Sequence, residues 1–175
     1  MTFLKNEDGI DYYIFKPSFF RLYYEKTSND APHRRSFTHK LHMLFYLLMG
    51  GYKVLYLALN DKIVSYLVFT RSRNLFVQSS NPRDIYTIFL WTYPEFRNRG
   101  YASKTANFLI NDTCFDYDNI YKTIALENAP SLKVAEKSGF INTGRARKKG
   151  LCRRIVKASE GDFYLMKYTR SNKHL

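Results

Sequence analysis

One stretch near the middle of the chain constrains the fold more than any other. An apolar, strand-like run over residues 85–91 leads into a basic loop at 93–102, which in turn opens a helix-like run. The first N–H groups of a helix lack intrahelical partners and lie at the positive end of its dipole, so such a corner can hold phosphate. Gly100 allows the backbone a positive φ, and Arg97 and Arg99 add positive charge.

A second pattern follows further along the chain, where residues 127–140 have the sequence ENAPSLKVAEKSGF. Asn128 suits the N-cap of a helix, and Pro130 suits the first turn, where its missing N–H costs nothing. Gly139 suits the position just beyond the helix end. Because a strand-like run at 121–126 precedes it, the stretch predicts a strand followed by a well-capped helix.

These two patterns carry a family resemblance. The spacing Arg97-x-x-Gly100-x-Ala102 resembles the acetyl-CoA pyrophosphate loop of the GNAT superfamily of N-acetyltransferases. The pattern from Asn128 to Phe140 resembles the helix after the fifth strand of that family, especially in the branch with ribosomal-protein N-terminal acetyltransferases. Both patterns follow a strand and occur in the family's order, which is more specific than either pattern alone.

The resemblance implies an α+β (mixed α/β) fold in a single GNAT-like domain over residues 1–175. A central, mostly antiparallel twisted sheet is expected, flanked by helices, with its fourth and fifth strands splayed apart. Residues 84–140 are expected to form the acetyl-CoA-binding core, and residues 1–50 a helical region on the acceptor side. The implied activity is direct transfer of an acetyl group from acetyl-CoA, as co-substrate, to a primary amine.

The same resemblance implies a set of cofactor-binding residues. Backbone groups of the strand are expected to pair with the pantetheine amides, and the loop N–H groups to surround the pyrophosphate. Two residues of the second pattern would face the pantetheine, and one lysine would serve an exposed phosphate. In chain order, these expected cofactor residues are Leu90, Trp91, Thr92, Arg97, Asn98, Arg99, Gly100, Tyr101, Ala102, Ser103, Asn128, Ser131 and Lys137.

The catalytic groups are less well matched. Many family members have a Tyr as general acid at the position of Ala135 in this chain. Many also have a Glu on the fourth strand, at a position that corresponds here to the vicinity of Thr87. Glu127, at the end of the strand, and Tyr86 are the substitutes we consider, as base directly or through water. Catalysis by positioning alone, or a chain that binds acyl-CoA without catalysis, remain open alternatives.

No metal is expected. His39 and His42 lie three residues apart on one helical face, but no nearby acidic or Cys partner completes a ligand set. We interpret them as polar positions on an apolar helix.

Hydrophobic periodicity and turn residues predict the remaining elements. Asn60-Asp61 is a hairpin-type turn between two of the strands. Helices are expected at 19–25, from Ser36 or Thr38 to Met49, at 101–112 and at 128–138. Strands are expected at 12–16, 53–59, 63–70, 75–78, 84–93, 121–126, 140–144 and 162–169.

Composition narrows the class of protein. With 45% hydrophobic residues, the chain of 175 residues is too apolar to be disordered. Only two cysteines occur, which suits a reducing cytosol, and the polar N-terminus lacks the apolar core of a secretory signal. The longest apolar run, 41–49, is far below the roughly 20 residues that span a bilayer. We therefore expect a cytoplasmic protein with no membrane partner, as a monomer or homodimer.

The formal net charge of +13 favours an anionic partner, and much of it lies in one stretch. Residues 145–160, expected as the loop before the last strand, contain seven Lys and Arg residues and one acidic residue, Glu160. Three interpretations stay open: an anionic acceptor such as an amino sugar on a nucleotide carrier, an aminoacyl-tRNA, or general basicity. The missing Tyr at Ala135 weakens the aminoacyl-tRNA interpretation, and the N-terminal acetyltransferase resemblance favours a peptide amine.

A nucleic-acid-binding module without catalysis is the main rival to an acetyltransferase. Such a module would place aromatic side chains among the basic ones for base stacking. Residues 145–157 contain no aromatic residue. Nucleic acid is therefore a possible but not a favoured partner.

Overall fold

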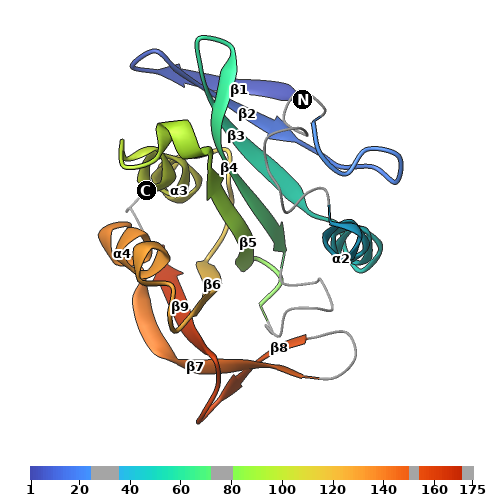
Figure 1. The fold of residues 1–175 in the computed structure, drawn as a ribbon, viewed down its shortest axis with the longest axis vertical. Helices are drawn as coiled ribbons and strands as arrows, with labels where there is room; N and C mark the ends of the chain where they lie inside the picture. Colours follow the sequence, from blue (N-terminus) through green and yellow to red (C-terminus); the bar gives the residue numbers. More distant parts are fainter. Residues whose placement is uncertain (25–35, 72–80, 150–153, 171–175) are drawn as a thin grey trace.

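The computed structural model describes residues 1–24, 36–71, 81–149 and 154–170. In these ranges nine strands form one sheet, in the order β1-β2-β3-β4-β5-β6-β9-β7-β8 (Figure 1). The strands are β1 (Thr2–Glu7), β2 (Ile10–Phe15), β3 (Lys53–Leu59), β4 (Lys62–Arg71), β5 (Ile85–Thr92), β6 (Asn119–Ala125), β7 (Ile141–Lys149), β8 (Arg154–Ala158) and β9 (Phe163–Thr169). The helices are α2 (Phe37–Leu48), α3 (Tyr101–Asn111), α4 (Ala129–Lys137) and a short 3-10 turn, η2 (Pro94–Phe96).

The sheet is antiparallel except between β5 and β6, which run parallel. Their pairing covers three residue pairs and ends at Thr87 and Lys122, although β5 continues to Thr92 and β6 to Ala125. Beyond this point the strands separate. The expected mixed sheet with splayed central strands is therefore confirmed.

A bulge lies at the point where the strands separate. In the ladder between β4 and β5, Val68 pairs with Phe89 and Phe69 with Thr87, so Ile88 is an extra residue. A bulge bends a strand and increases its local twist. It therefore turns the end of β5 away from the direction that pairing with β6 requires.

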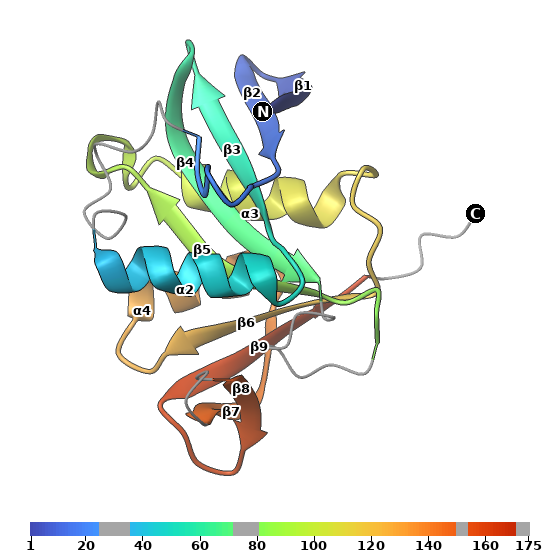
Figure 2. The same ribbon diagram turned by 90° about the vertical axis from the view of Figure 1, so that its right-hand side faces the viewer.

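Helices cover both faces of the sheet (Figure 2). On one face, α3 and α4 contribute Phe108, Leu109 and Ala135 to a core cluster that spans β2 to β9. On the other face, α2 contributes Met43 and Tyr46 to a second cluster, all of whose members lie before residue 97. Strands β3 and β4 are buried along most of their length, because both of their faces are covered.

The predicted turn at Asn60-Asp61 is present, and both residues have positive φ (48° and 60°). Such a pair of angles matches the right-handed twist of a two-residue hairpin. None of the helices among the described residues is long and apolar enough to cross a membrane.

Three expectations for the elements are wrong. No helix forms over 19–24, the described part of the helix expected at 19–25: these residues form a turn closed by a bridge between Ser18 and Arg21, and then bends. Phe19 and Phe20 are 62% and 96% exposed, so no packing stabilises a short helix there. Among the described residues of 1–50, a hairpin of β1 and β2 precedes the helix α2, and residues 25–35 lie outside the described part.

Strand β1 was not expected, and the stretch at 145–160 is not a loop. Residues 141–149 and 154–158 form strands β7 and β8, which pair with each other. Strand β1 lies at the sheet edge and is mostly exposed, so it shows no apolar alternation. The predicted strand at 75–78 falls outside the described residues.

Candidate functional site

The splayed strands enclose a cleft of about 630 Å³. Thr87 and Lys122, where the pairing of β5 and β6 stops, line one part of the cleft, which we call its closed end. Asn98 and Ala102, at the start of α3, line another part, which we call its open end. The lining residues come from β4, β5, the loop before α3, β6 and α4: Leu67, Thr87, Ile88, Phe89, Leu90, Trp91, Thr92, Arg97, Asn98, Ala102, Lys122, Thr123, Ile124, Ala125, Asn128, Pro130, Ser131 and Val134. Two sequence patterns far apart in the chain thus meet across one cavity.

The loop before α3 presents a row of unused donors at the open end. Asn98 and Gly100 both have positive φ (61° and 80°), and Gly100 is the N-cap of α3. The first hydrogen bond of the helix is from the Lys104 N–H to the Gly100 carbonyl. Among the described residues, the N–H groups of residues 98–103 donate no hydrogen bond. Successive free N–H groups at a helix start form an anion-binding concavity.

Space is available at this corner for a ligand. No atom lies within 4 Å of the position that a Cβ on Gly100 would occupy. Arg97 instead folds back onto the strand, where its Nε donates to the Thr92 carbonyl (3.2 Å) and its guanidinium lies 4.8 Å from the Trp91 ring centre. Arg99 is exposed and is not part of the cleft lining.

The start of α4 forms the opposite wall. Asn128 caps this helix, as predicted: its side-chain oxygen accepts a hydrogen bond from the Ser131 N–H (3.2 Å). Both residues line the cleft, and Pro130 lies between them. Lys137 is exposed in the last turn of α4, away from the cleft lining.

The two catalytic candidates lie in different environments. Tyr86 is 2% exposed, and its hydroxyl lies 2.5 Å from the Thr123 hydroxyl, which lines the cleft. Burial raises the pKa of Tyr86 above its ordinary value, so this side chain stays protonated. Glu127 is exposed in the turn after β6 and is not among the residues that line the cleft. The structure therefore does not bring the two together.

Ala135, which replaces the family's usual Tyr, is fully buried in the core beneath α4. Its neighbour Val134 lines the cleft instead. This face of α4 therefore offers the cleft an aliphatic side chain and no acid.

Lys122 is a cleft residue that the sequence analysis missed. It is 8% exposed, and its ammonium lies 4.0 Å from the centre of the Phe140 ring. Burial lowers the pKa of Lys122 to about 8. A signal was available in the sequence: Ile120, Lys122 and Ile124 alternate along β6, so a lysine occupies an inward-facing position.

His39 lies on the face of the sheet that α2 covers, where its ring contacts aromatic side chains. Its Nε2 lies 2.7 Å from the Tyr23 hydroxyl, and its ring packs against the edge of Phe89. No group of three or more His, Cys, Asp or Glu residues that could hold a metal ion occurs within the described ranges.

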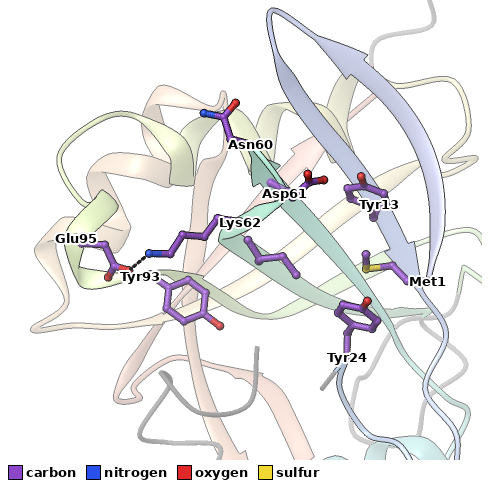
Figure 3. A pocket seen from close by; sticks show the side chains of 10 residues that line it. Met1, Tyr13, Tyr24, Asn60, Asp61, Lys62, Tyr93 and Glu95 are labelled. Atoms are coloured by element: carbon purple, nitrogen blue, oxygen red, sulfur yellow. Dashed lines mark ion pairs between the residues drawn. The ribbon is translucent and has the colours of Figure 1, made fainter. Parts of the chain in front are cut away.

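A second cavity, of about 790 Å³, lies beside the segment that follows β5, with Tyr93 and Glu95 in its lining (Figure 3). Thr92 and Arg97 line the cleft, whereas Tyr93 and Glu95 line the second cavity, so the segment between β5 and α3 borders both. Glu95 forms an ion pair with Lys62 (3.4 Å). The full lining is Met1, Tyr13, Tyr24, Ala58, Asn60, Asp61, Lys62, Ile63, Tyr93 and Glu95. Tyrosine rings and carboxylates are groups that attract a cationic amine.

The basic hairpin of β7 and β8 acquires aromatic neighbours from β9. The Arg145 guanidinium lies 4.6 Å from the Tyr164 ring centre, and the Lys148 ammonium 4.7 Å from that of Phe163. The sequence of residues 145–157 contains no aromatic residue, but the sheet supplies them from the neighbouring strand. Basic and aromatic groups are therefore interleaved on this surface.

The fold and the cleft together define a class of α+β protein with a ligand-sized cleft between two splayed strands. The sequence matches the profile of the Acetyltransferase (GNAT) family over residues 14–140, which is more than half of the chain. The chain therefore belongs to the GNAT family of acetyltransferases. No curated protein matches its sequence.

Solved structures with the same fold are distant in sequence. One is the ribosomal-protein-S18-alanine N-acetyltransferase of Escherichia coli (13% identity, TM-score 0.59, covering 94% of this chain and 98% of that one). A second is a chimera of the spermidine N-acetyltransferase SpeG from Vibrio cholerae and hSSAT (14% identity, TM-score 0.60, covering 91% of this chain and 95% of that one). A third is YncA of Salmonella typhimurium with its cofactor acetyl-CoA (15%, 0.57, 94% and 96%). At these identities the likeness establishes the fold alone.

Proposed function

We propose that this protein transfers an acetyl group from acetyl-CoA to a primary amine within a ternary complex. The observation that carries the proposal is the row of free N–H groups at 98–103, placed at the open end of the cleft. These donors match a pyrophosphate, and the unpaired edges of β5 and β6 match the amides of a pantetheine arm. YncA, which has the same fold, was solved with acetyl-CoA.

In this reaction the neutral amine attacks the thioester carbonyl carbon, a C–N bond forms, and the C–S bond then breaks. The sulfur leaves as a thiolate and takes up a proton, and the amine loses one. Holding the two reactants in line accounts for about 7–11 kcal/mol of such a barrier. Beyond Thr87, β5 has no pairing with β6, and a backbone N–H group on this edge would stabilise the oxyanion.

The side chains would act around this backbone frame. Tyr86 stays protonated, so we assign it the role of holding the Thr123 hydroxyl toward the cleft rather than that of a base. Glu127, exposed in the turn after β6, would accept the amine proton only through intervening water, since it does not line the cleft. Loop N–H groups from Asn98 to Ser103 would bind phosphate, and Asn128 and Ser131 the pantetheine.

The acceptor would enter from the face of the sheet that carries α2. The second cavity, with Tyr13, Tyr24 and Asp61, suits a cationic amine such as a polyamine or a peptide N-terminus. The E. coli structure is that of an N-acetyltransferase for an alanine of ribosomal protein S18, and the V. cholerae chimera is that of a spermidine N-acetyltransferase. Aminoacyl-tRNA is a second candidate acceptor, because the β7–β8 hairpin combines Arg145 with the Tyr164 ring.

Titration calorimetry with acetyl-CoA tests the cofactor site. Gly100→Glu places a carboxylate in the open space at the phosphate corner, and we expect it to weaken binding by about a hundredfold or more through charge repulsion and strain. Gly51→Glu is the matched control: Gly51 has φ +78°, similar to the +80° of Gly100, and equally open surroundings, but it lies outside the cleft.

Two results would contradict the proposal. If Gly100→Glu binds acetyl-CoA as tightly as the wild type does, the loop does not hold the pyrophosphate. If both glycine variants lose binding equally, the loss reports backbone strain and the assignment of the loop also fails.

A further inference from the structure

The closed end of the cleft has more polar groups than an acetyl methyl requires. Thr87 and Lys122 form the last pair of the parallel ladder, and Thr123 is the next residue along β6. All three line the cleft. A methyl group has nothing to offer an ammonium or hydroxyl, so an apolar wall would suit acetyl-CoA better.

Lys122 is the unusual member of this group. The residue is more than nine-tenths buried, and within the described part of the chain its ammonium group makes no hydrogen bond and no ion pair, although its backbone pairs in the sheet. Burial alone lowers its pKa to about 8, so the ammonium is still the main form at pH 7. Burying a charge without a partner is costly, which suggests that its partner arrives with a ligand.

The ring contact with Phe140 does not remove this cost. A cation above an aromatic face gains electrostatic attraction, at 4.0 Å here. The ammonium still has three donors, and a ring face provides no acceptor atom for them. A carboxylate would satisfy both the charge and the donors.

The position of Lys122 places it beyond the reacting carbonyl. With the pyrophosphate at the start of α3, the pantetheine arm lies along β5 from Thr92 toward Thr87, a span of about 16 Å at roughly 3.3 Å per residue. This placement depends on the proposed function. The thioester then lies near the closed end, and the acyl chain extends toward the Thr87–Lys122 pair.

We propose that the cleft accepts CoA thioesters whose acyl chain ends in a carboxylate, of the succinyl type, and that Lys122 is the counter-ion of that carboxylate. The transfer step has the same balance as acetyl transfer. The amine nitrogen bonds to the thioester carbonyl carbon, the C–S bond breaks, and CoA leaves as its thiol. The distal carboxylate and the Lys122 ammonium pair but do not react, so Lys122 determines specificity without entering the chemistry.

Calorimetric titration of the full chain with succinyl-CoA and butyryl-CoA tests this inference. Both acyl groups have four carbon atoms, but only succinyl ends in a carboxylate. We expect wild-type protein to bind succinyl-CoA about tenfold more tightly than butyryl-CoA, through a charge-assisted contact in a partly dry site. Lys122→Met should bring the ratio to about one or reverse it, and Lys122→Arg should keep the preference for succinyl-CoA.

The outcomes separate this inference from the proposed function. If wild-type protein binds acetyl-CoA, but binds succinyl-CoA no more tightly than butyryl-CoA, the inference is wrong and the acetyltransferase site stands. If the succinyl preference persists in Lys122→Met, another group is responsible and the assignment of Lys122 fails. If no CoA thioester binds, the proposed function and the inference fall together.

Discussion

Lys122 also affects how the stability of the protein depends on pH. Burial lowers its pKa in the folded state to about 8, while the unfolded chain has the ordinary value of 10.5. Between these two values the unfolded state binds more protons, so the free energy of unfolding rises with pH over this interval. Below pH 8 the cost of the buried ammonium is present in full.

We predict that Lys122→Met is more stable than the wild type at pH 7, because methionine fills a similar volume without a charge. The advantage should shrink as the pH rises from 8 toward 10.5, because the wild-type lysine is then neutral in the folded state and loses its proton in the unfolded state as well. Urea unfolding at pH 7 and at pH 10 measures both quantities. An advantage of the same size at the two pH values would mean that the folded and unfolded states bind the same number of protons, so that burial does not lower the pKa of Lys122.

A lysine in this position was open to prediction, whereas the roles of Tyr86 and Ala135 were not. Alternation along one strand gives the direction of a side chain, so Lys122 could be placed inward from sequence alone. The hydroxyl contact between Tyr86 and Thr123 joins different strands, and its existence depends on the register of β5 against β6. Register across a parallel pair is set by packing that a single sequence does not display.

At the level of elements, the helices and strands with strong local sequence signals were predicted. Those that depend on pairing with neighbouring strands were not. The helix α4 has an N-cap, an N-terminal proline and a following glycine, and it lies close to the predicted bounds. Strand β1 is an exposed edge and pairs only with β2, so it carries no apolar pattern. Strands β7 and β8 are rich in lysine and arginine. They form because β7 pairs with β8 on one edge and with β9 on the other.

The cap of α4 provides a test at this level. Asn128→Ala removes the acceptor for the Ser131 N–H, and we expect a loss of about 1 kcal/mol in the free energy of unfolding. Asn128→Ser keeps a capping oxygen and should retain most of that stability. Because the proposal has the Asn128 amide contact the pantetheine, we expect both variants to bind acetyl-CoA several-fold more weakly.

Thermal or urea unfolding and calorimetry on the same samples separate the two roles of Asn128. Should the serine variant recover both stability and affinity, the residue is a cap and not a cofactor contact. Should neither variant lose stability, the hydrogen bond to Ser131 contributes nothing measurable.

At the scale of the whole molecule, the net charge of +13 acts on every anionic ligand. Acetyl-CoA carries its charge on phosphates, while acetyl-pantetheine has the same thioester without the nucleotide. The field of a strongly basic protein attracts the first and is screened over about 10 Å in 0.1 M salt.

We therefore predict that the KM for acetyl-CoA rises several-fold between 0.05 and 0.5 M sodium chloride, values that span about 14 to 4 Å of screening length. The KM for acetyl-pantetheine, although higher, should change little over the same range. Initial rates with an excess of a neutral acceptor, or binding measured by calorimetry, give the comparison. If the KM values of both thioesters change equally with salt, the change comes from the protein's conformation and not from attraction of the phosphates.

The three-pair contact between β5 and β6 has a consequence for how the chain folds. It joins two blocks of contiguous sequence: β1 to β5, in which each strand pairs with its predecessor, and β6 to β9. The aromatic cluster under α2 is made entirely of residues before 97, so the first block contains a core of its own. A meander of sequence neighbours can assemble while the chain is still being synthesised, before residues 119–169 emerge. The seam between the blocks closes afterwards, and the binding cleft is consequently among the last features of the molecule to take shape.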